Sequence, residues 1–186
     1  EIHEHKDGLR GVPTGFVDLD KMLSGLQKSD LIILAARPSV GKTTLALDIA
    51  RRAAVQHNVP VGIFSLEMSS QQLVDRMLAA ESSVDAWKLR TGRLSKDHEF
   101  AYLREGLDRL AKAPICINDQ AGINIMNRRA AVRRMKSEHN LGLVIVDYRQ
   151  LMTPMRSSDS MVQQVTEISR SLKGLAKDLD VPVLAL

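Results

Sequence analysis

The stretch Ala36–Thr44, ARPSVGKTT, decides the fold of this chain of 186 residues. It follows a short apolar run, Leu31–Ala36, and precedes a segment with helical periodicity, residues 42–57. A strand, a loop that ends in GKT and a helix are together typical of a phosphate-binding P-loop, or Walker A motif. In such a loop the backbone N–H groups and the helix N-terminus point at phosphate oxygens.

The loop therefore predicts a nucleotide site for ATP. Lys42 supplies a fixed cation for the β- and γ-phosphates, and the Thr43 hydroxyl is a hard oxygen ligand suited to Mg²⁺. The nucleotide-binding residues that we expect are Arg37, Pro38, Ser39, Val40, Gly41, Lys42, Thr43 and Thr44. The first position of the motif is Ala36 instead of glycine, but the GKT sequence and the flanking elements support the assignment.

Apolar strand patterns and helical patterns alternate outward from this loop. The expected strands are 31–36, 61–66, 115–118, 143–146 and the final VPVLAL, and the first of them reads as a strand covered on both faces. The expected helices are 42–57, one that opens at Ser69, 95–112, 125–140 and 161–179. Ser69 and Gln72 form a capping-box pattern. The alternation predicts an α/β fold with a mainly parallel sheet flanked by helices.

Two acids stand at the ends of expected strands. Asp147 ends the apolar run in LVIVDY, where an open α/β sheet binds its ligands, and we expect it to hold Mg²⁺. Glu67, in IFSLEMS, ends the second strand in the same way. A carboxylate there can orient the water that attacks the γ-phosphate, so Glu67 is the expected catalytic base. One acid for metal and one for water indicate hydrolysis, and no acceptor site or lid of a small-molecule kinase is evident.

Composition and charge set broad limits. The net charge is +4 and the sequence pI is about 9.4, which permits a polyanionic partner without requiring one. The single cysteine, Cys116, excludes an internal disulfide and fits a cytoplasmic protein. No apolar run approaches a membrane span, and the start, Glu1–Arg10, is charged throughout. The two histidines of HEH near that start are expected to be solvated.

Two basic stretches bear on a nucleic-acid partner. The segment Arg128–Lys136 reads as the solvated face of an amphipathic helix. Arg156, in the polar stretch after Asp147, is the one candidate DNA-binding residue. Because only six residues are Phe, Tyr or Trp, phosphate contacts rather than base stacking would have to dominate any single-strand binding.

Several longer motifs make the pattern specific. They are GVPTGFVDLDKMLSGL at 11–26, ARPSVGKTTLALDIA at 36–50, FSLEMSSQQLVDRML at 64–78, VIVDYRQLM at 144–152 and EISRSLKGLAKDLDVPVLAL at 167–186. Together they resemble, in order and over almost the whole chain, the C-terminal motor domain of DnaB-type replicative helicases. ARPSVGKT followed by SLEMS is closer to that family than to the recombinases and clock ATPases that share its RecA-like core.

The resemblance implies a RecA-like P-loop NTPase in a homohexameric ring that encircles single-stranded DNA, translocates by ATP hydrolysis between subunits and unwinds duplex DNA. It implies a primase and a helicase loader as partners. It carries the P-loop role onto Lys42 and Thr43, the catalytic role onto Glu67 and the metal role onto Asp147.

The pattern along the chain and the resemblance together give the expected boundaries. Residues 1–15 contain three glycines and a proline and are expected to be a linker or entry segment. Residues 16–186 are expected to be the motor domain, truncated at its C-terminus because the chain ends inside an apolar strand pattern. The family's Gln-bearing segment, a DNA loop and a basic finger that reaches a neighbour's ATP would then lie beyond Leu186. Arg149 departs from the family pattern, in which an apolar residue is expected.

Three functions stay open at this point. The first is a ring helicase motor, the second is a recombinase-like filament ATPase, and the third is a nucleotide-gated binding module in which hydrolysis acts only as a timer. The particle formed with nucleotide and single-stranded DNA distinguishes them, as a closed ring, a helical filament or neither.

Overall fold

The computed structural model describes residues 10–37, 39–65, 67–94, 97–119, 125–147 and 161–186. Of residues 97, 125–129 and 161–164 only the backbone is described. Arg149 therefore lies outside the described residues, and so do the side chains of Arg128 and Arg129 in the basic 128–136 stretch.

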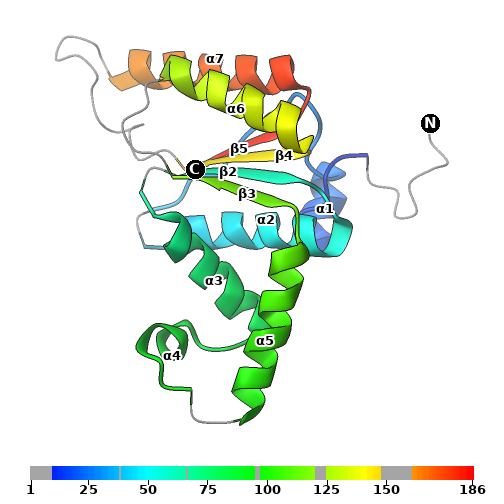
Figure 1. Cartoon of the computed structure of the whole chain (residues 1–186). Coiled ribbons are helices and arrows are strands. Elements are labelled where there is room, and N and C mark those ends of the chain that lie inside the picture. Colours follow the sequence, from blue (N-terminus) through cyan, green and yellow to red (C-terminus); the bar gives the residue numbers. More distant parts are fainter. Residues whose placement is uncertain (1–9, 38, 66, 95–96, 120–124, 148–160) are drawn as a thin grey trace.

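Five parallel strands form one sheet in the order β1-β5-β4-β2-β3 (Figure 1). The strands are β1 (Leu31–Ile33), β2 (Val61–Ser65), β3 (Ile115–Asn118), β4 (Leu143–Asp147) and β5 (Val183–Ala185). All residues of β2, β4 and β5 are buried. The α/β prediction with a parallel sheet is confirmed, and the final apolar run is a central strand that pairs with β1 and β4.

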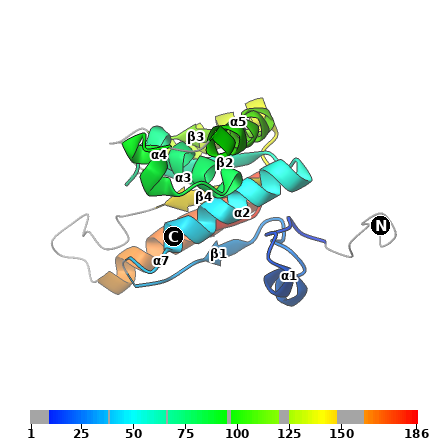
Figure 2. The ribbon, with the colours of Figure 1, turned by 90° about the horizontal axis from the view of Figure 1, so that it is seen from below.

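Helices cover both faces of this sheet (Figures 1 and 2). They are α1 (Val17–Leu23), α2 (Lys42–His57), α3 (Ser70–Ser82), α4 (Ala86–Thr91), α5 (Asp97–Lys112), α6 (Ile125–His139) and α7 (Met161–Leu179). The helix α2 lies on one face, and α6 and α7 lie on the other. Among the described helices, none combines the length and the apolar character that a bilayer crossing needs.

Side chains that alternate along the strands pack into two separate hydrophobic cores, one on each face of the sheet. In β4, Leu143 and Ile145 pack with α2, whereas Val144 and Val146 pack with α6 and α7. Successive side chains of a strand point to opposite faces, so Asp147 must face the same side as Ile145. This periodicity directs the carboxylate that ends β4 toward α2 rather than toward α7.

The first strand differs from its prediction. It has three residues, lies at the sheet edge and leaves Ile33 60% exposed, so it is not covered on both faces. The apolar run predicted a buried strand, but β5 inserts between β1 and β4, and this strand order leaves β1 at the edge. The edge position is set by the crossover connections and not by the residues of the run itself.

Two short helices, α1 and α4, were not predicted. Both are under eight residues, too short for a helical period to stand out from the pattern. The capping box at the start of α3 is confirmed: Ser69 Oγ accepts from the Gln72 N–H, and the Gln72 side chain accepts from the Ser69 N–H.

The described part of the expected linker packs onto the domain. Thr14 is fully buried, and its N–H and hydroxyl both donate to Asp20 at 2.8 Å. The Arg52 side chain on α2 donates to the Gly15 carbonyl at 2.6 Å and stacks over the Phe16 ring. The division of the chain after residue 15 stays a prediction, but this segment is held against the second half of α2.

An ion-pair network centred on the buried pair Arg51–Glu81 joins α2, α3 and α5. Glu81 of α3 binds Arg51 of α2 through one carboxylate oxygen and Arg109 of α5 through the other. Arg51 also binds Asp48 at 3.2 Å. The side chains of Arg51 and Glu81 are only 11% and 9% exposed, so each charge depends on its partner.

We predict that Glu81→Ala lowers the free energy of unfolding by about 3 kcal/mol, because it leaves a buried guanidinium with one partner fewer. Urea unfolding followed by circular dichroism measures the change. The control is Glu105→Ala, whose carboxylate is 67% exposed and lies 3.7 Å from Arg109. It should change stability by less than about 0.5 kcal/mol. Equal losses of stability in the two variants would contradict the claim that burial makes the Glu81 ion pairs important for the fold.

Candidate nucleotide-binding site

The chemistry-bearing residues meet at the carboxyl edge of the sheet. Because all strands are parallel, the connection from β1 into α2 and the ends of β2 and β4 lie on the same side of the molecule (Figure 1). Ser65 and Asp147 are register partners on the neighbouring strands β2 and β4. Glu67 follows two residues after Ser65, so its turn starts beside Asp147.

The loop that precedes α2 has an unusual backbone. Gly41 is the N-cap of α2 with φ of 101°, and a Cβ at this position would meet nothing within 4 Å. The glycine is therefore needed for its conformation and not for space. Ser39 also has a positive φ, of 66°. Left-handed backbone at a residue other than glycine is strained, and such strain gathers at binding sites.

The N-terminus of α2 is free to bind an anion. Its N-cap, Gly41, has no side chain to accept from the first N–H groups, and the first turn contains no acidic residue. No residue of the helix's own first turn therefore offsets the positive end of its dipole. Lys42 and Thr43 open this helix and are both half-buried, while Thr44 is exposed.

Asp147 is the most buried acid of the site. It is 3% exposed, and the Thr43 hydroxyl donates to its Oδ2 at 3.4 Å. Burial raises the pKa of Asp147, the positive charge of Lys42 acts against this rise, and the negative charge of Glu67 adds to it. The four side chains predicted to do the chemistry are therefore electrostatic neighbours, although they come from separate parts of the chain.

Thr43 and Asp147 fit a magnesium ion chemically. Hydroxyl and carboxylate oxygens are the hard donors that Mg²⁺ prefers. The described residues hold no group of three or more His, Cys, Asp or Glu that could bind a metal by themselves. A magnesium ion at this position would therefore take its remaining ligands from phosphate and water, as is usual for nucleotide sites.

The remaining residues predicted to bind nucleotide or DNA lie in the loop before α2 or outside the described residues. Arg37, Ser39 and Val40 form the exposed part of the loop, and Val40 is 70% exposed. Pro38 and Arg156 lie outside the described residues, so their roles stay predictions.

Two polar side chains at this edge were not singled out from the sequence. Ser65 is 1% exposed at the end of β2, and Asp119 follows directly after β3. Their position after an apolar strand is the same signal that identified Asp147 and Glu67, and could have found them.

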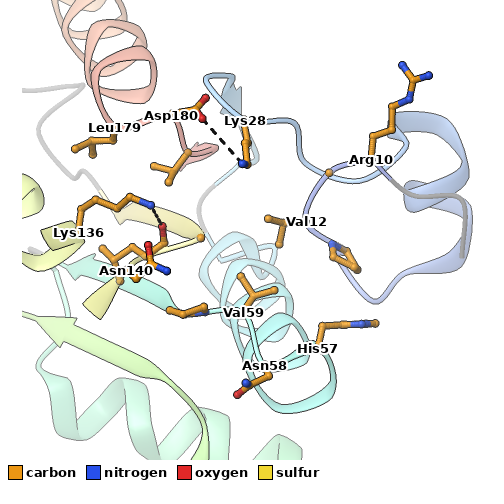
Figure 3. Close-up of a pocket in the computed structure, with 16 residues that line it drawn as sticks. Arg10, Val12, Lys28, His57, Asn58, Val59, Lys136, Asn140, Leu179 and Asp180 are labelled. Carbon is orange, nitrogen blue, oxygen red and sulfur yellow. Dashed lines mark hydrogen bonds and ion pairs between the residues drawn. The ribbon is translucent and has the colours of Figure 1, made fainter. Parts of the chain in front are cut away.

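A cavity of about 780 Å³ lies at the opposite, amino edge of the sheet (Figure 3). It is lined by the C-terminal ends of α2, α6 and α7 and by residues 10–13. Lys136 donates to the Leu141 carbonyl, and Lys28 lies 4.0 Å from Asp180. Converging helix C-termini carry partial negative charge, whereas the lining side chains of Arg10, Lys28 and Lys136 carry positive charge. None of the predicted nucleotide-binding residues lines this cavity.

Comparison with known proteins agrees with the geometry. The sequence model of the DnaB-like helicase C terminal domain matches residues 11–186. The replicative DNA helicase DnaB of Geobacillus stearothermophilus is 50% identical over the whole chain, and the replicative DNA helicase DnaC of Bacillus subtilis is 47% identical. The chain spans about 41% of the length of each of these relatives.

Two solved structures share the fold. One is described as an ATPase domain, with a TM-score of 0.86 and 33% identity, covering 96% of this chain and 63% of that one. The other is a DnaB-like replicative helicase described with its interactions with primase, with a TM-score of 0.86 and 34% identity. It covers 99% of this chain and 45% of that one.

We predict that Asp147→Asn stabilises the nucleotide-free protein at pH 7. The folded state holds the Asp147 proton more tightly than the unfolded chain, because burial raises its pKa above the ordinary 3.8. The contribution of this carboxyl group to the free energy of unfolding therefore falls as pH rises through the raised pKa. It is smallest where the group is ionised in both the folded and the unfolded states. The neutral amide of asparagine removes the cost of burying this charge, so we expect the free energy of unfolding to rise by roughly 1 kcal/mol.

Urea unfolding at several pH values measures this effect. The gain should disappear toward low pH, where the carboxyl group of the original protein is protonated in both states. Asp108→Asn, which changes an exposed aspartate on α5, is the control and should show no such pattern. A loss of stability in Asp147→Asn at pH 7 would mean that the Asp147 charge supports the fold.

Proposed function

The chain belongs to the family of DnaB-like helicase C-terminal domains, and from this premise we propose that it is the ATP-hydrolysing motor of a replicative DNA helicase. The observation that carries the proposal is the meeting of Lys42, Thr43 and Asp147 at the N-terminus of α2, with Glu67 close enough to add to the raised pKa of Asp147. This arrangement pairs a phosphate site and a metal site with a separate carboxylate for the water, which is what hydrolysis of a nucleoside triphosphate requires.

Each residue has a distinct task in this proposal. The N–H groups of the loop from Arg37 to Thr44 and of the first turn of α2 bind phosphate oxygens. Lys42 neutralises the charge of the outer phosphates. Thr43 and Asp147 would hold Mg²⁺, which when bound would draw negative charge from the phosphate oxygens.

Glu67 takes the proton of the attacking water. It is exposed, which leaves its carboxylate accessible to water, and it belongs to the turn that starts at the end of β2. Because Asp147 is buried against Thr43 while Glu67 is exposed, the two acids occupy different environments and can take different roles.

The assembly and its partners follow from the family and are proposed on that basis. They are a homohexameric ring, single-stranded DNA in its channel and a loader and a primase as partners, in the cytoplasm of a bacterium. A filament ATPase or a nucleotide-gated binding module would share the P-loop chemistry. A closed ring in electron micrographs, obtained with ATP and single-stranded DNA, supports the proposal, and a helical filament contradicts it.

We predict that Lys42→Ala abolishes measurable ATP binding without unfolding the domain. Lys42 is half-buried at the start of α2 and does not belong to either hydrophobic core. Calorimetric titration with ATP and Mg²⁺ measures the loss, and circular dichroism checks the fold. Lys21→Ala, an exposed lysine on α1, is the matched control with unchanged affinity. Unchanged affinity in Lys42→Ala would overturn the assignment of the phosphate loop.

We predict that Glu67→Gln keeps ATP binding but lowers hydrolysis by roughly 10²-fold or more, the scale of losing a general base. Glutamine has a similar shape but cannot accept the proton of the water. The assembled full-length protein is assayed for ATP turnover and for separation of a forked DNA duplex, and both should fall together. Full turnover in this variant would show that another residue activates the water.

A further inference from the structure

The turn that carries Glu67 is short and joins the sheet to a helix. It lies between the end of β2 at Ser65 and the start of α3 at Ser70. Within the described residues, no hydrogen bond or ion pair holds the Glu67 carboxylate itself. The position of this carboxylate therefore depends on how the two ends of the turn are fixed.

The first end of the turn is tied to β2. The Met68 N–H donates to Ser65 Oγ at 3.1 Å, and Ser65 is 1% exposed beside β4. This bond fixes the residue after Glu67 relative to β2, but it does not fix the direction in which α3 leaves.

The second end of the turn is the start of α3, and only a contact with residues outside α3 can fix it to the sheet. The capping box of Ser69 and Gln72 satisfies N–H groups within the helix and its cap, so it does not attach the helix to the sheet. The apolar residues of α3 pack into the core, and Asp119 attaches the first residue of this helix to the end of β3. Its Oδ2 accepts from both the N–H and the hydroxyl of Ser70, each at 2.7 Å.

Asp119 is itself fixed by the sheet. It follows β3 directly, and β3 pairs with β2 up to the partners Asn118 and Phe64. The hydrogen bonds from Ser70 lower the pKa of Asp119, so it is ionised at neutral pH. A carboxylate at a helix N-terminus forms charge-assisted bonds and is favoured by the helix dipole.

We propose that Asp119 is a positioning residue for ATP hydrolysis: with Ser70 it fixes the start of α3 against β3, and thereby the turn that carries Glu67. The inference rests on the proposed role of Glu67 and extends it to a residue outside the nucleotide loop. Asp119 differs from Asp147 and Glu67, the other acids at this edge, because its carboxylate binds the backbone of α3. A displacement of about 1 Å at a reacting group can cost as much as 10²-fold in rate, so a contact that only sets position can matter for catalysis.

The test uses ATP hydrolysis by the assembled full-length protein, with single-stranded DNA present. We expect Asp119→Ala to lower kcat roughly 10-fold to 100-fold, while the dissociation constant for ATP stays unchanged. Asp119→Asn should recover most of the activity, because its amide oxygen can still accept from Ser70. Asp75→Ala is the matched control: Asp75 accepts an exposed bond within α3, from Gln71, and its loss should leave kcat unchanged.

A double variant separates positioning from a general loss of structure. If Asp119 acts only through Glu67, then Asp119→Ala should cost nothing further in a Glu67→Gln background. Losses that multiply in the double variant would overturn the proposal. So would a weakening of ATP binding as large as the fall in kcat, or an Asp119→Asn variant as slow as Asp119→Ala.

Two further measurements keep the outcome clear. If Asp119→Ala does not fold, Ser70→Ala removes one of the two bonds and keeps the backbone bond, and it should lower kcat by a smaller factor; an unchanged kcat would overturn the proposal. If Glu67→Gln alone hydrolyses ATP at the original rate, the failure lies in the proposed function, and it is seen before the double variant is compared.

Discussion

The parallel direction of all five strands is the constraint on which the rest of the structure depends. It brings the ends of β2, β3 and β4 and the start of α2 to one edge, so that residues as far apart as 104 positions become neighbours. The contact between Thr43 and Asp147 is the direct result, because both the strand pairing and the alternation within β4 direct Asp147 toward α2.

This edge contains several unfavourable features that the remainder of the fold must offset. Asp147 is buried beside Glu67, Ser39 has a left-handed backbone, and the first N–H groups of α2 have no capping side chain. Each of these is costly in the nucleotide-free protein and would serve the proposed binding of phosphate and a cation. The two hydrophobic cores on either side of β4 and β2 supply the stability that permits such a site.

The helices around the site are linked by charge as well as by apolar packing. Arg51 on α2 forms an ion pair with Glu81 near the C-terminal end of α3, whereas Asp119 holds the N-terminal residue of α3 against β3. Glu67 lies just before the start of α3, and Lys42 lies at the start of α2. The contacts at both ends of α3 therefore set the relative position of α2 and the turn that carries Glu67.

The sequence by itself determined the local features of this protein: the P-loop, the capping box at Ser69 and the acids at the strand ends, because each depends on a few consecutive residues. It also predicted the parallel sheet, since strands and helices alternate. Only the tertiary structure decided that β1 lies at the sheet edge and that Asp119 binds Ser70. Strand order and contacts across 49 residues arise from how the elements pack, which no local pattern contains.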